Sequence, residues 1–245
     1  MEIRIADNRR ALGESAAKYI AALLKEIIAV NGHARVVLST GASQFEVLEY
    51  LTAEPDIPWN QVEMFHLDEY VGLPETHPAS FRKYLNERFV HKTAPLAAIH
   101  FVDGTEEGIR FLTEELHNAP VDIGLIGIGE NGHIAFNDPP ADFETRESYI
   151  IVNLDDACKR QQVREGWFAS LEDVPKQAVS MTAYQIMQCQ HIVSCVPGSV
   201  KANAIAKTLR ATEITDQIPA TILKNHPNFI LYLDKDSAAE ILSIS

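Results

Sequence analysis

The chain has 245 residues, of which 46% are apolar and 22% are charged, which argues against global disorder and suits one large α/β domain. Its formal net charge of −13 argues against nucleic acid and anionic membranes as partners, because both are bound by basic surfaces. Three cysteines without paired spacing, no N-terminal signal-like core and no apolar run of about 18 to 20 residues predict a cytoplasmic protein with reduced thiols.

Apolar residues recur at steps of three and four between Leu12 and Ile28, which predicts an amphipathic helix. Asn31 and Gly32 are expected to end it, because glycine tolerates the left-handed cap. Short apolar runs then alternate with helical patterns along the chain. The expected strands are 36–38, 62–67, 99–102, 123–128, 192–196 and 229–233. The expected helices lie around 45–51, 81–89, 106–116, 202–209 and 237–242.

This alternation predicts an α/β fold with a doubly wound, mostly parallel, Rossmann-like sheet and helices on both faces. No linker, repeat or composition break divides the chain, so we expect a single domain over residues 1–245. The stretch from Pro139 to Pro175 departs most from the pattern, and its polar part at 142–173 is a candidate lid. In such folds ligands bind beyond the carboxyl ends of the strands, so the loops there are the candidates for a site.

The first such loop is Ser39-Thr40-Gly41-Ala42-Ser43. Backbone N–H groups at a helix start, together with hydroxyls and a flexible glycine, form a cradle for phosphate. The alternative is an ordinary turn in which the last serine caps the helix.

The second loop contains Asp68 and Glu69, two adjacent carboxylates at the end of an expected strand. A carboxylate shielded from water there would have a raised pKa and could serve as a base. The alternative is an acidic turn exposed to solvent.

The third loop, 127–139, has the sequence GIGENGHIAFNDP and contains a G-x-G-x-x-G pattern after a strand. A dinucleotide site needs a helix directly after the glycines, whereas Pro139 and Pro140 would break one. The glycines, Gly129 among them, more simply let the backbone approach a sugar. His133 can exchange protons near neutral pH, and Asp138 could fix its tautomer. A structural histidine is the alternative.

Three cations could reach a phosphate in this acidic chain. Lys201 follows the expected strand at 192–196 and would lie in the first turn of a helix, where an anionic ligand would explain it. Arg160 and Arg164 are further candidates. The alternatives are a solvated lysine and the polar face of a helix.

Taken in order, these segments resemble the glucosamine-6-phosphate deaminase/isomerase family, whose fold is shared with 6-phosphogluconolactonases. The resemblance runs from about Val36 to Leu233. Its most specific parts are LDEYVGL at 67–73, HPAS at 77–80 and the third loop. It implies an enzyme that deaminates and isomerises an amino-sugar 6-phosphate without metal or nucleotide cofactor.

The resemblance also implies roles for single residues. Asp68 would abstract the C2 proton, and His133 would open the pyranose ring with support from Asn131 and Asp138. The phosphate would be held by a larger set of residues. That set comprises Thr40, Gly41, Ser43, Lys201 and either Arg160 or Arg164.

Three features depart from the family pattern. Many members have an acid where Asn131 stands and glutamate where Asp138 stands, which we interpret as subfamily variation. Some hexameric members are activated by N-acetylglucosamine 6-phosphate through basic residues after the third loop and a longer C-terminus. Here residues 144–150 are ETRESYI and the sequence stops at Ser245, so we expect no such activation.

The expected reaction converts glucosamine 6-phosphate and water to fructose 6-phosphate and ammonia, in a monomer or a homo-oligomer. Galactosamine 6-phosphate is an alternative substrate that no residue excludes. A 6-phosphogluconolactonase is a second alternative, although that family typically continues the Gly-His pair with TASLFP and this chain has IAFNDP. An inactive sugar-phosphate sensor is the third.

Overall fold

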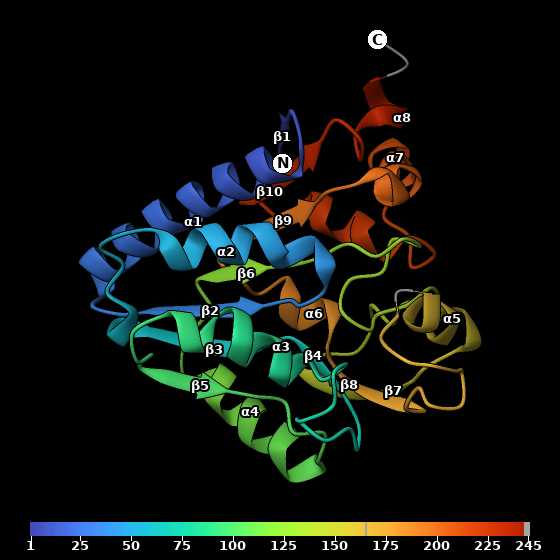
Figure 1. Cartoon of the computed structure of the whole chain (residues 1–245), viewed down its shortest axis with the longest axis horizontal. Helices are drawn as coiled ribbons and strands as arrows, with labels where there is room; N and C mark the ends of the chain where they lie inside the picture. Colours follow the sequence, from blue (N-terminus) through green and yellow to red (C-terminus); the bar gives the residue numbers. More distant parts are fainter. Residues whose placement is uncertain (165, 243–245) are drawn as a thin grey trace.

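The structure, a computed structural model, describes residues 1–164 and 166–242. Within these ranges a seven-stranded parallel sheet forms the centre, with the order β1-β10-β9-β6-β2-β3-β5 (Figure 1). Its strands, in that order, are β1 (Glu2–Ala6), β10 (Phe229–Asp234), β9 (His191–Val196), β6 (Ile123–Leu125), β2 (Ala34–Leu38), β3 (Val62–His66) and β5 (Ala98–His100). The predicted parallel sheet is confirmed.

Helices cover both faces of this sheet, as predicted. On one face, α1 (Arg9–Asn31), α2 (Phe45–Ala53) and α3 (Phe81–Arg88) pack with Val36 and Leu38 of β2. On the other face, Val37 of the same strand packs with helices from later in the chain. Those helices are α4 (Glu106–Asn118), α6 (Ala183–Ile186) and α7 (Ala202–Arg210), with the 3₁₀ helix η5 (Pro219–Asn225). Every residue of β2 is buried, which explains why the strand contains the apolar run Val36-Val37-Leu38.

The first helix ends where the sequence predicts. Asn8 caps its start by accepting a hydrogen bond from the backbone N–H of Ala11 at 3.0 Å. Gly32 has φ 77° and donates its backbone N–H to the carbonyl oxygen of Ile28 at 2.8 Å. This left-handed cap is the one expected of Asn31-Gly32.

A second sheet of three antiparallel strands, β4-β8-β7, lies beside the first. It consists of β4 (Asp68–Tyr70), β8 (Gln177–Met181) and β7 (Tyr149–Asn153). The stretch at 139–175 indeed leaves the main sheet and supplies β7 and α5 (Asp156–Arg164). The candidate lid at 142–173 thus contains a paired strand and a helix, and its movement stays a prediction.

Several boundaries differ from the expectation. The strand expected at 62–67 ends at His66, because Asp68 starts a strand that pairs with the second sheet instead. The strand expected at 123–128 ends at Leu125, and the last helix, α8, spans only Ala239–Leu242. β1, β7, β8 and α6 were not predicted. β1 is an edge strand with mostly exposed side chains, and in the outer strand β7 only the first residue is buried, so neither resembles a buried run.

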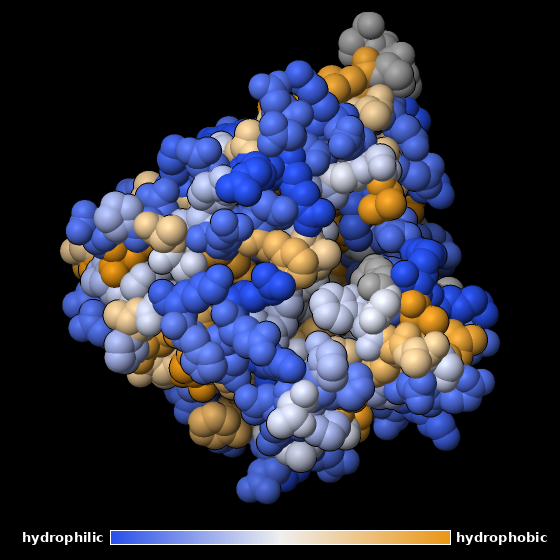
Figure 2. All heavy atoms as spheres, in the orientation of Figure 1, coloured by the Kyte–Doolittle hydropathy of each residue, from blue (hydrophilic) through white to orange (hydrophobic). Residues whose placement is uncertain are grey.

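The surface in the view of Figure 2 is largely hydrophilic, with apolar side chains in small separate groups. Among the residues that the structure describes, no helix has the length and apolar character needed to cross a membrane.

Candidate active site

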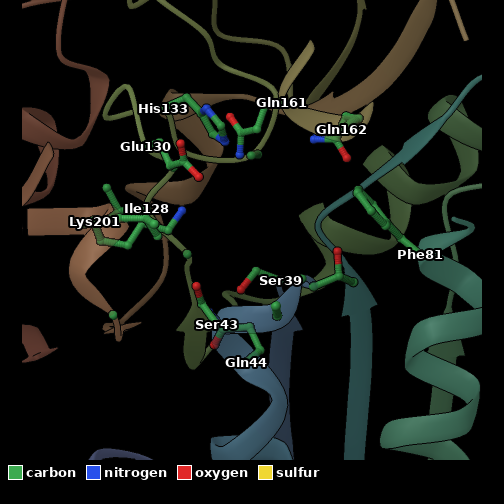
Figure 3. A pocket seen from close by; sticks show the side chains of 18 of the residues that line it. Ser39, Ser43, Gln44, Phe81, Ile128, Glu130, His133, Gln161, Gln162 and Lys201 are labelled. Carbon is green, nitrogen blue, oxygen red and sulfur yellow. The ribbon is translucent and has the colours of Figure 1, made fainter. Parts of the chain in front are cut away.

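The loops singled out in the sequence meet at one cavity of about 650 Å³ beyond the carboxyl ends of the central strands. Residues 39–45 form one side of it, and Asp68, Gly129, His133 and Lys201 line it as well. The α5 segment closes another side with Gln161, Gln162, Arg164 and, after the helix, Trp167. Figure 3 shows Ser39, Ser43 and Gln44 opposite His133 and Gln161, with Lys201 at the flank.

The first loop starts a helix toward the cavity. Gly41 has φ 95° and ψ 168°, a conformation that favours glycine, and it precedes η1 (Ala42–Gln44) and α2. Tyr84 Oη donates a hydrogen bond to its carbonyl oxygen at 2.9 Å, which fixes the turn. The N-cap of α2 is Gln44, which makes no side-chain capping bond, so the expected alternative of a Ser43 cap is not observed.

A second helix start faces the same cavity with nearly the same backbone geometry. Gly198 has φ 94° and ψ 148° and precedes η4 (Ser199–Lys201), which leads into α7. Both carboxylate oxygens of Asp234, a buried residue, accept its backbone N–H at 3.0 and 3.1 Å. Two helix N-termini therefore direct positive potential into the cavity of an acidic protein.

The three candidate cations differ in position. Lys201 lies in η4, directly before α7, and lines the cavity (Figure 3). Arg164 also lines it and forms an ion pair with Glu130, another lining residue. Arg160 lies one turn earlier on α5, has a 61% exposed side chain 3.9 Å from Asp156, and is not among the lining residues. The Arg164 side chain is equally exposed, at 61%, so the cavity lining alone favours Arg164, and a role in binding phosphate stays a prediction for both arginines.

The two adjacent carboxylates have different environments. Glu69 is fully buried and accepts hydrogen bonds from Ser80 Oγ at 2.9 Å and from the backbone N–H of Arg82 at 2.9 Å, so it anchors the start of α3. Asp68 is 6% exposed and lines the cavity. Among the described residues its Oδ1 has no hydrogen-bond partner. Neither group belongs to the solvated acidic turn that was the alternative.

Burial controls the ionisation of Asp68. Removal from water, with a smaller contribution from the negative charge of Glu69, raises the pKa of Asp68 to about 8. Such a carboxylate is a stronger base than an exposed aspartate once it loses its proton, and its pKa lies near neutral pH, as general base catalysis requires.

The His133 ring is fixed by contacts at one of its two nitrogens, Nδ1. Its Nδ1 lies 2.7 Å from Asn131 Oδ1 and 3.2 Å from Asp138 Oδ1. Asn131 Nδ2 in turn donates to Asp138 Oδ1 at 3.0 Å. With two oxygen acceptors at Nδ1, the proton of the neutral ring belongs on that nitrogen, which leaves Nε2 free to accept a proton.

Asp138 carries the negative charge of this group. Burial alone would raise the pKa of Asp138, but hydrogen bonds from His133 and Asn131 outweigh it and lower the pKa. The departures from the family pattern at positions 131 and 138 thus keep a carboxylate within hydrogen-bond reach of the imidazole.

Gly129 has a more specific task than the one expected. A Cβ built on it would lie 2.1 Å from Cε1 of His133, so a side chain there would displace the imidazole. The glycine thus makes room for the histidine ring rather than only for a sugar. No helix follows the third loop before α5 within the described residues 127–155, as the prolines predicted, and this contradicts the dinucleotide alternative.

Several lining residues were not singled out in the sequence. Gln44, Glu130 and Gln161 belong to predicted loops or helices but carry no motif of their own. Gln162 is 8% exposed and accepts a hydrogen bond from Tyr70 Oη at 2.8 Å. The only sequence signal for Gln44 was its place directly after the first loop.

A separate cluster of possible metal ligands lies away from the cavity. Donor atoms of Glu63, His100 and Glu115 are within 4.8 Å of one another. The Glu63 carboxylate already accepts from His100 Nε2 at 2.7 Å and from Arg35 Nε at 2.8 Å. Because a guanidinium occupies the place of a cation, this cluster is an ion-pair network.

Comparison with known proteins agrees with this geometry. The family model for glucosamine-6-phosphate isomerases/6-phosphogluconolactonase matches residues 7–231. A glucosamine-6-phosphate deaminase of Staphylococcus epidermidis is 36% identical over 234 residues, which cover 91% of this chain and 94% of the relative. A glucosamine-6-phosphate deaminase of Shouchella clausii is also 36% identical, over 92% of this chain and 93% of its own.

A solved structure of a monomeric glucosamine-6-phosphate deaminase has a TM-score of 0.89 and 27% identity, covering 98% of this chain and 99% of that one. The 6-phosphogluconolactonase of Thermotoga maritima shares the fold, with a TM-score of 0.78 at 18% identity over 96% of this chain and 99% of that one. The chain therefore belongs to the glucosamine-6-phosphate isomerase/6-phosphogluconolactonase family.

Proposed function

We propose that this enzyme converts glucosamine 6-phosphate and water to fructose 6-phosphate and ammonia. The observation that supports this most is the pairing of two groups at one cavity. Asp68 contributes a buried carboxylate whose Oδ1 has no partner in the described part of the chain, and His133 contributes an imidazole held at Nδ1. The relatives at 36% identity are named for the same reaction.

The phosphate of the substrate binds at the two helix starts. Backbone N–H groups around Gly41 and Ser43 point along the axis of α2, and those after Gly198 do the same for α7. The Lys201 ammonium adds a full positive charge to the cavity, and Arg164 exchanges its partner Glu130 for the phosphate. Thr40 and Ala42 complete the loop.

Ring opening is the first chemical step. The proton of the C1 hydroxyl leaves, the bond between C1 and the ring oxygen breaks, and the ring oxygen gains a proton. His133 mediates this transfer through Nε2, because Nδ1 remains bound to Asn131 and Asp138. The product is the open-chain aldehyde with the amine on C2.

Asp68 then removes the C2 proton, which the neighbouring aldehyde has made acidic. The aldehyde oxygen takes a proton from the ammonium group, which gives a neutral enolamine. The proton held by Asp68 is then delivered to C1, which leaves an iminium at C2. Water adds there and ammonia departs, giving the keto sugar. The cationic amine of the bound substrate favours the charged form of Asp68 and so opposes the effect of burial. General acid–base catalysis supplies about 10² to 10⁴-fold per step, and positioning through the phosphate supplies much of the rest.

The experiment is an assay of the purified protein on three compounds. Ammonia and fructose 6-phosphate are expected from glucosamine 6-phosphate. Ammonia from galactosamine 6-phosphate alone would transfer the assignment to the C4 epimer. Hydrolysis of 6-phosphogluconolactone without ammonia from either amino sugar would overturn the proposal, and binding without turnover of any compound would identify a sensor.

A further inference from the structure

Two buried polar groups of the cavity have no task in the mechanism above. Gln44 is fully buried and Ser39 is 4% exposed, and both line the cavity (Figure 3). Among the described residues, Gln44 Oε1 and Ser39 Oγ have no hydrogen-bond partner. A buried polar atom without a partner lowers stability, so such atoms in a cavity indicate where a ligand supplies hydrogen bonds.

The orientation of the Gln44 amide is determined by its surroundings. Its Nε2 donates to the carbonyl oxygen of Cys195 at 3.3 Å. The reverse orientation would place two acceptor oxygens against each other, so the amide keeps Nε2 on this carbonyl and leaves Oε1 as the unpaired atom.

The Ser39 and Gln44 side chains lie beside the same glycine. A Cβ built on Gly127 would lie 3.5 Å from Gln44 Nε2 and 3.7 Å from Ser39 Oγ, so both side chains adjoin the bare backbone of this glycine. The Ser39 backbone N–H donates to the carbonyl oxygen of Leu125 at 2.9 Å, which fixes the residue at the end of β2. Ser39, Gln44 and Gly127 together form a polar part of the cavity wall, which we call the floor.

The chemistry of this floor selects its ligand. Gln44 Oε1 can only accept a hydrogen bond, so it repels the oxygens of a phosphate dianion although Ser43, next to it, belongs to the phosphate loop. A hydroxyl group fits both residues, since it can donate to the amide oxygen while it accepts from or donates to Ser39 Oγ.

The floor also lies between the two ends of the substrate. Gln44 directly follows the phosphate loop. Ser39 follows Leu38, the register partner of His66, and the chain after His66 leads to Asp68. In a hexose 6-phosphate, the carbons between the phosphate-bearing C6 and the reacting C2 carry the hydroxyls at C3 and C4.

We propose that Gln44 and Ser39 bind a hydroxyl of the sugar chain between C2 and C6 and thereby determine which hexosamine phosphates the enzyme accepts. This inference rests on the proposed function for the placement of the sugar.

The test combines two variants of the enzyme with two substrate analogues, each of which lacks one hydroxyl. The kcat/KM of wild type, Gln44→Leu and Ser39→Ala is measured on glucosamine 6-phosphate and on its 3-deoxy and 4-deoxy analogues. For wild type, one of the two analogues is expected to lose at least about tenfold, because a site built to bind a hydroxyl rejects a substrate that lacks it. In Gln44→Leu the same analogue is expected to perform no worse than the parent compound. Equal losses in wild type and Gln44→Leu for both analogues would overturn the proposal.

A matched control separates this effect from a general effect of burial. Ser194 is a fully buried serine of β9 whose Oγ also has no partner within the described ranges, but it does not line the cavity. Ser194→Ala is expected to keep the wild-type preference between parent and deoxy compounds. Ser39→Ala, the smallest change to the floor, answers the question if Gln44→Leu does not fold.

Failure of the proposed function would be visible separately. If wild type releases no ammonia from any amino sugar, the affinities of wild type and both variants for the same compounds are measured by calorimetry. A loss of affinity for one deoxy analogue that disappears in Gln44→Leu or Ser39→Ala would still support the floor as a hydroxyl site. The absence of such a difference would overturn it.

Discussion

Replacing Asp68 by asparagine is expected to abolish turnover and to stabilise the protein at the same time. In the unfolded chain the carboxyl has its ordinary pKa of 3.8, whereas burial raises the pKa of Asp68 to about 8 in the folded protein. Between these values the folded protein holds a proton that the unfolded chain has released. The contribution of protonated Asp68 to the free energy of unfolding is therefore full below about pH 4. It is lost progressively as the pH rises from there through about 8.

The size of the stabilisation by Asp68→Asn follows from the difference between the pKa of Asp68 in the folded and unfolded states. At pH 7 the raised pKa corresponds to about 4 kcal/mol of lost stability. The amide of asparagine carries no charge, although its own buried polar atoms cost about 1 to 2 kcal/mol. Asp68→Asn is therefore expected to gain about 2 to 3 kcal/mol at pH 7, which corresponds to a rise in Tm of about 4 to 12 °C. At pH 4.5 the gain should nearly vanish.

The assay is thermal unfolding of wild type and Asp68→Asn at several pH values, together with kcat for glucosamine 6-phosphate. A loss of at least about 10³-fold in kcat is expected, because the base is gone. Glu69→Gln is the matched contrast, since that carboxylate accepts from Ser80 and Arg82 and its loss should lower Tm. Equal Tm values for wild type and Asp68→Asn at pH 7 would refute the account of burial, and retained turnover would remove Asp68 as the base.

Three further substitutions test the rest of the site. Gly129→Ala places a methyl group 2.1 Å from Cε1 of His133, so kcat should fall about 100-fold while the melting curve stays cooperative. Asp138→Asn removes the charge beside Nδ1 and should lower kcat about 10 to 100-fold with little change in KM. Arg164→Ala should raise KM about tenfold, whereas Arg160→Ala, paired with Asp156 outside the cavity, should leave steady-state kinetics unchanged.

Buried strands and their loops could be predicted because they leave local signals. The apolar run of β2 and the glycine after it predicted a strand, a turn and a helix start, and the structure has all three. β4 could not be predicted, because its pairing with β8 depends on residues more than a hundred positions later. Register between distant strands follows from packing, which a local pattern does not contain.

The candidate site likewise contains some residues with a local sequence signal and others without one. His133 was found because an imidazole in a glycine-rich loop is chemically conspicuous. The sequence did not separate Arg160 from Arg164, and the structure shows that Arg164 lines the cavity whereas Arg160 does not. Gln44 was missed because glutamine is neutral and common, and only its burial with an unpaired oxygen sets it apart.

An acidic chain can bind a phosphate because the positive potential is local. Gly41 and Gly198 adopt closely similar left-handed geometries before two helices that start at one cavity. The backbone N–H groups there are dipoles rather than charges, so they leave the net charge of −13 unaffected and are pre-oriented before the ligand arrives. Lys201 then needs to contribute only one full charge. The affinity for phosphate should therefore depend on the backbone at these two glycines far more than on the overall charge of the surface.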